Sequence, residues 1–107
     1  MNRELHDSLF ELYIVGGLEL MTLGTRGLKR ELIIDLETSA LTPEKGDIIH
    51  YRAVNRFDPE DEFDEWARPR SPLQLEAELI LGVTNKQLSN CRPSEEVFSD
   101  FQSFLGI

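Results

Sequence analysis

The stretch of residues 31–54, ELIIDLETSALTPEKGDIIHYRAV, decides how this chain can fold. Residues 32–34 and Leu36 are apolar, which predicts a central strand over residues 31–36 that is buried on both faces. Asp35 and Glu37 interrupt the end of this run, although burying an uncompensated carboxylate is costly. Because alternate residues of a strand point to the same side, the two carboxylates are expected to point the same way.

The residues after this strand predict a turn and two more strands. TSALTPEKGD has the composition of a turn, and residues 47–57 predict a second strand. Its expected inner face holds Ile49, Tyr51, Ala53 and Phe57, and its outer face holds His50, Arg52 and Arg56. The acid-rich run of residues 58–65 is interpreted as a solvated hairpin turn. Residues 63–69 would return as a third strand.

Helices are predicted on both sides of these strands. Residues 3–15 predict a helix that ends at Gly16 and Gly17, and residues 18–30 predict either a strand or a loose connection. Downstream, Ser71 and Gln74 match a capping box for a helix that ends at Gly82. Its expected buried stripe is Leu73, Ala77 and Ile80, with Leu75 and Leu79 alongside.

Two further helices follow in the sequence. Thr84 and Gln87 repeat the capping pattern for a short helix through Leu88. A last helix is expected from near Ser94 to Gly106. Its apolar face comprises Val97, Phe98, Phe101, Phe104 and Leu105.

Length and composition describe one small acidic domain. The chain has 107 residues and a net charge of -9, which argues against a surface built for non-specific phosphate binding. Cys91 is the single cysteine, so neither a disulfide framework nor a thiolate metal cluster is expected. We find neither a signal peptide nor a run long enough to span a membrane, and therefore expect a cytoplasmic protein without membrane association.

The paired acids allow two interpretations. Asp35 and Glu37 converge at the carboxyl end of a strand, where open α/β sheets place their ligand crevices. Two carboxylates attract a hard divalent cation such as Mg²⁺ or Mn²⁺. The alternative is that Asp35 caps the next turn and Glu37 is simply exposed, because a two-residue pattern recurs by chance.

The surrounding residues add a resemblance to a known family. Residues 32–38, LIIDLET, followed by Leu41, Pro43, residues 47–49 and residues 53–54, resemble the opening of DnaQ-like (DEDD) 3′–5′ exonucleases. This family includes the DNA polymerase III epsilon subunit and the exonuclease part of PolC-type polymerases. WARPRSPLQLEAELILGVTNKQL and CRPSEEVFSDFQSFLG are similar to the segments that follow in the family.

The resemblance implies a fold and a site. It implies a mixed α/β, ribonuclease H-like exonuclease fold, truncated to about three strands and three to four helices. Residues 1–30 would form an N-terminal helix and connection, and residues 31–107 the N-terminal portion of the exonuclease-like domain. Asp35 and Glu37 match the first two catalytic, metal-binding acids. Thr38 and Leu41 match positions that contact the terminal nucleotide of a nucleic-acid 3′ end.

The sequence also departs from the family pattern. It ends at Ile107, before the second and third acidic motifs, and neither His6 nor His50 matches the catalytic base. Ser39 and Ala40 replace the usual Thr-Gly. We therefore expect a weak half-site for Mg²⁺ or Mn²⁺ and little or no turnover by the chain alone. His50 is expected to have a surface or pairing role.

A fold that lacks part of the family's sheet also affects which partners are expected. Without its usual neighbour, the strand from Leu32 to Leu36 would be an unpaired apolar edge. The segment of residues 12–21 could cover it, or two copies could pair through it, and a homodimer or another protein partner is the favoured expectation. Two alternatives to the exonuclease stay open: a non-catalytic module that binds a protein or nucleic acid, and a truncated relic.

Overall fold

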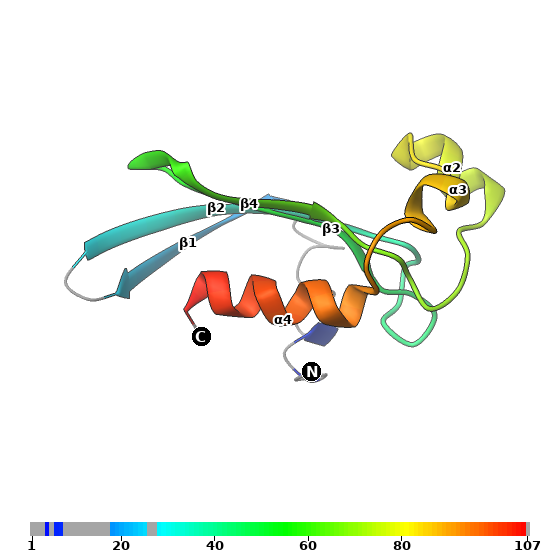
Figure 1. Cartoon of the computed structure of the whole chain (residues 1–107), viewed down its shortest axis with the longest axis horizontal. Helices are drawn as coiled ribbons and strands as arrows, with labels where there is room; N and C mark the ends of the chain where they lie inside the picture. Colours follow the sequence, from blue (N-terminus) through cyan, green and yellow to red (C-terminus); the bar gives the residue numbers. More distant parts are fainter. Residues whose placement is uncertain (1–3, 5, 8–17, 26–27, 107) are drawn as a thin grey trace.

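The fold is a twisted antiparallel sheet with a helix on one face and two short helices at one end (Figure 1). The computed structural model describes residues 4, 6–7, 18–25 and 28–106, with the backbone alone for residues 18–25, 28 and 29. The strands are β1 (Leu18–Thr25), β2 (Leu28–Thr38), β3 (Ile48–Asn55) and β4 (Asp58–Trp66), and they lie side by side in chain order. The expected mixed α/β class is therefore confirmed, with four strands rather than about three.

The strand that carries Asp35 lies inside the sheet. β2 pairs with β1 from Leu18↔Asp35 to Thr25↔Leu28 and with β3 from Leu32↔Asn55 to Thr38↔Ile48. The expectation that residues 32–36 form an exposed edge is therefore wrong, because the segment 18–25 forms a strand beside them. A homodimer built on that edge loses its basis.

The N-terminal predictions have separate outcomes. Residues 4, 6 and 7 are helical, and the rest of the helix expected over residues 3–15 lies outside the described residues. The domain boundary after residue 30 stays a prediction, although β2 crosses that position.

The acid-rich run of residues 58–65 is a strand, and its interpretation as a turn is wrong. The turn is shorter, at residues 56–57, and β4 begins immediately after it. Phe63 packs against the core while most of its neighbours in β4 are exposed. Carboxylates on an outer strand of the described sheet discourage pairing with another strand, which is a common protection for such strands.

The core lies between the sheet and α4 (Ser94–Leu105). Leu32, Ile34 and Leu36 of β2 face α4, whose Val97, Phe98, Phe101 and Leu105 are fully or almost fully buried. The predicted apolar face of this helix is confirmed. Its end is confirmed too, because Gly106 has a φ of 82°, a conformation that glycine adopts without strain.

A β-bulge changes which residues of β3 face the core. The register between β2 and β3 shifts between Glu37 and Thr38, so Ile48 joins Tyr51 in the main core. Ile49 instead packs with Leu73, Val83 and Leu88 in a second apolar cluster. The expectation that Ile49 shares a face with Tyr51 is therefore wrong, because an extra residue reverses the alternation. Phe57, also expected on that face, lies in the turn and is half exposed.

The second cluster holds α2 (Leu75–Leu81) and α3 (Asn85–Leu88) at one end of the sheet. The predicted Ser71–Gln74 capping box is wrong, since α2 begins after Gln74 without a side-chain cap. The Asn85 amide accepts from Leu73 N and donates to Leu73 O, which holds that residue outside the helix. Ile80 is 84% exposed, so its assignment to a buried stripe is also wrong.

The predicted capping box of α3 is confirmed, and substitutions can compare it with the Ser71–Gln74 box that the structure does not form. Thr84 Oγ1 accepts from Gln87 N, and Gln87 Oε1 accepts from Thr84 N. We expect Thr84→Ala to lower the free energy of unfolding by about 1 kcal/mol, whereas Ser71→Ala should change it by less than about 0.5 kcal/mol. Chemical denaturation followed by circular dichroism measures both, and equal losses would contradict this assignment of caps.

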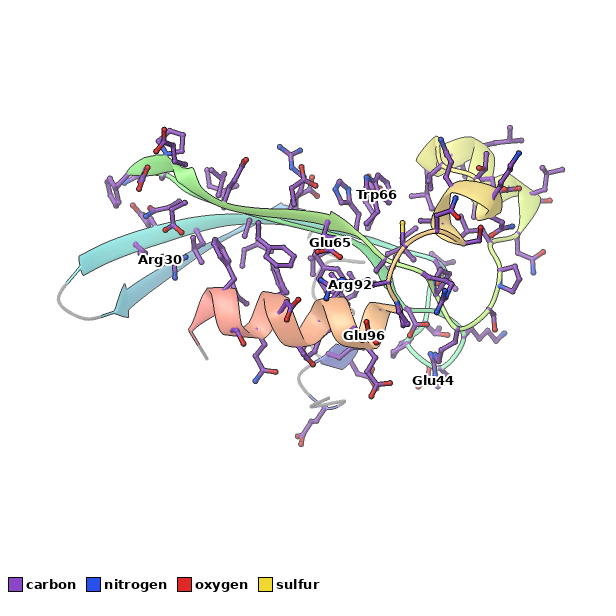
Figure 2. All side chains as sticks on the ribbon, in the orientation of Figure 1. Arg30, Glu44, Glu65, Trp66, Arg92 and Glu96 are labelled. Carbon is purple, nitrogen blue, oxygen red and sulfur yellow. The ribbon has the colours of Figure 1, made fainter. Side chains whose placement is uncertain are left out.

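Arg92 ties β4 to α4 on the covered side of the sheet (Figure 2). Its guanidinium donates to both carboxylate oxygens of Glu65 at 2.9 and 2.8 Å and lies 2.8 Å from Asp100. The hydrogen bonds with Glu65 and then with Asp100 raise the pKa of Arg92 above its usual value. Trp66, by contrast, lies on the opposite side of the sheet from α4 (Figure 2).

Candidate functional site

Asp35 and Glu37 lie on the sheet face that α4 does not cover. Leu32, Ile34 and Leu36 alternate with them along β2 and fill the core on the other side. The acids therefore avoid the core, and each is partly exposed. The same-side arrangement expected from strand alternation is what the backbone produces.

The Asp35 carboxylate stands next to a cation that is engaged elsewhere. Arg52 lies directly opposite Asp35 on β3, yet its Nε lies 3.5 Å from Asp64 Oδ2 on β4. Within the described part of the chain, the Asp35 side chain makes no hydrogen bond or ion pair.

Glu37 has one oxygen that is shielded from solvent. Glu37 Oε2 is buried and has no hydrogen-bond partner among the described residues, although the side chain as a whole is 37% exposed. His50 lies opposite Glu37 on β3, and its Nδ1 is 3.9 Å from this oxygen, beyond hydrogen-bonding distance. A buried oxygen without a hydrogen bond costs free energy of folding, and a bound ligand would remove that cost at Glu37 Oε2.

The His50 ring is fixed from two sides. Its Nε2 lies 2.7 Å from Asp64 Oδ1, and its ring stacks on Trp66 with 3.9 Å between centroids and 9° between planes. The expected pairing role of His50 is therefore confirmed. Asp64 and Trp66 are not predicted at this site from the sequence. The register of β4 against β3 shifts between Val54 and Asn55, so counting pairs back from the turn would place Phe63 rather than Trp66 opposite His50.

The surface around Asp35 is a shallow hollow. It has a volume of about 110 Å³. It is lined by Ile33, Asp35, Arg52, Ala53, Val54, Glu62 and Phe63. Pockets for small organic ligands usually enclose about 300 Å³ or more, so this hollow suits a hydrated ion better than a nucleotide.

The other two predicted site residues belong to the loop after β2. Thr38 Oγ1 donates to Ala40 O at 3.1 Å, and Leu41 is 81% exposed. Gly46 closes this loop so tightly that a Cβ there would lie 2.7 Å from Ala40 N. The roles of Thr38 and Leu41 in nucleotide binding stay predictions.

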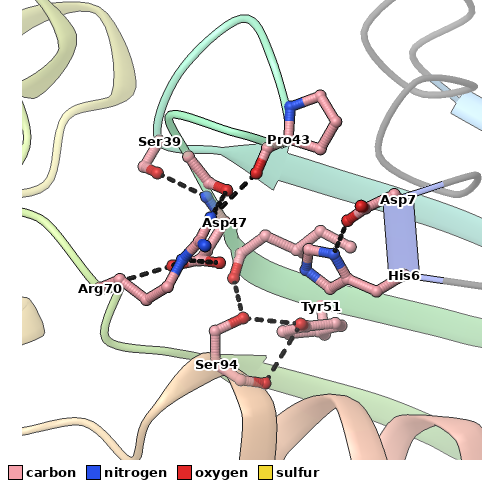
Figure 3. A network of polar contacts seen from close by, with 10 residues as sticks. His6, Asp7, Ser39, Pro43, Asp47, Tyr51, Arg70 and Ser94 are labelled. Carbon is pink, nitrogen blue, oxygen red and sulfur yellow. Dashed lines mark hydrogen bonds and ion pairs between the residues drawn. The ribbon is translucent and has the colours of Figure 1, made fainter. Parts of the chain in front are cut away.

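Arg70 holds this loop from outside (Figure 3). Its guanidinium donates to Pro43 O, Gly46 O and the Asp47 carboxylate, which also accepts from Arg70 N at 2.7 Å. Asp47 N in turn donates to Ser39 Oγ. No sequence pattern indicates this network, because Arg70 lies 23 residues after Asp47.

The site falls short of a full metal centre. Among the described residues, no group of three or more His, Cys, Asp or Glu side chains is arranged to hold a metal ion. The half-site for Mg²⁺ or Mn²⁺ at Asp35 and Glu37 stays a prediction.

In the part of the chain that the structure describes, every helix is too short or too polar to cross a membrane.

Comparison with known proteins relates the chain to a replicative polymerase. It is 32% identical over 75 residues to DNA polymerase III PolC-type of Lactococcus lactis subsp. lactis, covering 68% of this chain and 5% of the relative. The polymerase of the same description from Thermotoga maritima is 30% identical over 102 residues, or 89% of this chain and 8% of the relative. No model of a protein family and no solved structure matches. The chain therefore contains a region related to PolC-type DNA polymerase III and spans only a small part of such a polymerase.

Proposed function

We propose that this chain is an exonuclease-like region that binds a divalent cation through Asp35 and Glu37 and has little or no turnover alone. The observation that carries the proposal is the pair of same-facing carboxylates on β2, of which Asp35 has no ion pair in the described chain and Glu37 has a buried, unsatisfied oxygen. Similarity to PolC-type polymerases supports a substrate with a nucleic-acid 3′ end.

The residues present fit Mg²⁺ or Mn²⁺ that keeps much of its water. Both ions accept oxygen ligands, and Mg²⁺ is commonly held by one or two carboxylates. When bound, such a cation would polarise a phosphoryl oxygen of the substrate. Asp35 and Glu37 would hold it, while the loop containing Thr38 and Leu41 would contact the terminal nucleotide.

The same geometry supports low activity. Two-metal nucleases clamp the attacking and leaving oxygens between two metal ions. Two carboxylates are too few to bind two such ions. The net charge of -9 also repels a polyanion. The ribonuclease H-like fold and metal-dependent hydrolysis belong to the same proposal.

A non-catalytic protein-binding module is the second candidate. Leu75, Leu79 and Ile80 of α2 are 66%, 75% and 84% exposed. Adjacent apolar side chains on one short helix are unusual for a surface that meets only water. If the chain is such a module, replacing Asp35 or Glu37 should leave its binding to a protein partner unchanged.

Cation binding tests the proposal directly. We expect Asp35→Asn and Glu37→Gln each to weaken Mn²⁺ binding by about tenfold or more, because each removes a charged oxygen ligand. Electron paramagnetic resonance of free Mn²⁺ measures the affinity. Glu76→Gln is the matched control, because it removes an equal charge from α2 and should leave the affinity unchanged.

The same variants decide between the two candidates. Trimming of a labelled 3′ end in Mn²⁺ should be weak and should disappear in Asp35→Asn. Activity that persists in Asp35→Asn would reject the site. Equal Mn²⁺ binding by the wild type and both site variants would reject the half-site and favour the protein-binding module.

A further inference from the structure

The contact between Glu37 and His50 differs from an ordinary ion pair. His50 Nδ1 and Glu37 Oε2 face each other at 3.9 Å, too far for a hydrogen bond. The imidazole is 14% exposed, and its orientation is set by Asp64 and by the stack on Trp66. Two polar atoms thus lie close together without a hydrogen bond between them.

The proton on the imidazole determines what His50 offers to Glu37 Oε2. An ionised carboxylate only accepts hydrogen bonds, so the 2.7 Å contact with Asp64 Oδ1 requires the proton on Nε2. In the neutral ring, Nδ1 then carries a lone pair and lies 3.9 Å from Glu37 Oε2. A carboxylate that fixes the far nitrogen of a histidine is the usual support for a metal-binding imidazole.

The distance between the two atoms is close to that between two ligands of one metal ion. Two donor atoms that each lie about 2.1 Å from one ion in tetrahedral geometry are about 3.4 Å apart. The 3.9 Å between Nδ1 and Oε2 is slightly longer, so a small approach of the two side chains would let both reach one ion. One ion there would also provide the buried Glu37 Oε2 with the partner that it lacks among the described residues.

We infer that His50 Nδ1 and Glu37 Oε2 together bind a divalent transition metal, and that the site prefers Mn²⁺ and similar ions to Mg²⁺. Imidazole suits transition metals, whereas Mg²⁺ prefers oxygen ligands. Asp64 positions the ring and Trp66 supports it. The inference rests on the proposed cation half-site, of which Glu37 is one ligand, and adds a nitrogen ligand that determines the metal.

Trp66 provides a readout that does not depend on activity. It is the single tryptophan of the chain and stacks on the proposed ligand. In the full chain, we expect Mn²⁺ or Co²⁺ to quench its fluorescence saturably and reversibly with a chelator. Mg²⁺ should compete only at a concentration at least about tenfold higher, because it gains little from a nitrogen ligand. Competition by Mg²⁺ at equal concentration would overturn the inference.

Two substitutions separate the ligand from the scaffold. His50→Phe keeps an aromatic ring against Trp66 but removes both nitrogens, and should weaken Mn²⁺ binding by about tenfold or more. His50→Gln removes the ring as well and should weaken it at least as much, while Glu76→Gln should not. If both His50 variants remain folded by circular dichroism and bind Mn²⁺ as the wild type does, His50 is not a ligand.

The proposed function and this inference fail in different ways. Loss of Mn²⁺ binding in Asp35→Asn, without loss in the His50 variants, would support the carboxylate half-site and overturn the nitrogen ligand. Loss in the His50 and Glu37 variants, without loss in Asp35→Asn, would support the metal site at His50 and reject the paired acids.

Discussion

Phe101→Ala should lower the free energy of unfolding by about 4 kcal/mol, the cost of removing a fully buried aromatic ring from a packed core. Phe101 is completely buried in α4, where its ring meets Tyr51 at 5.2 Å and Phe63 at 5.3 Å between centroids. The substitution leaves a cavity between the sheet and the helix. Since small domains are stable by about 5–15 kcal/mol, much of the native stability would be lost.

Urea denaturation followed by circular dichroism measures this effect. Ile80→Ala is the control, because Ile80 is also a large apolar helical residue but is 84% exposed. It should change the free energy of unfolding by less than about 0.5 kcal/mol. Equal losses in the two variants would contradict the burial that the structure assigns to α4 and α2.

These two residues also show where sequence periodicity succeeds and fails. α4 is long, begins and ends with recognisable signals and has one apolar face, so Phe101 was placed correctly. α2 is short and apolar on several sides, so its pattern allowed more than one buried face. The side chain of Asn85, twelve residues away, holds Leu73 and shifts the helix start.

At the candidate site, too, the sequence predicts some features and misses others. The same-facing arrangement of Asp35 and Glu37 follows from the two-residue repeat of any strand. The pairing of β2 with β1 depends on a segment whose sequence allowed a strand or a loop. The bulge that moves Ile49 to the other face is an insertion in the register, which alternation alone does not reveal.

Arg70→Ala should cost about 3 kcal/mol in the free energy of unfolding, because it removes the cation that faces a buried carboxylate. The Asp47 side chain is 3% exposed, and Arg70 Nε lies 3.0 Å from its Oδ1. The same guanidinium also donates to Pro43 O and Gly46 O. Half of the Arg70 side chain is in solvent, so we expect the lower end of the range for buried pairs.

Matched variants separate the charge from the position. Arg68→Ala removes an equal charge two residues away from an exposed side chain and should change stability by less than about 0.5 kcal/mol. Asp47→Asn in the Arg70→Ala background should recover part of the loss, since a neutral amide is less costly to bury than a carboxylate. A double-mutant cycle measures this coupling, and additive losses would contradict a direct interaction between Asp47 and Arg70.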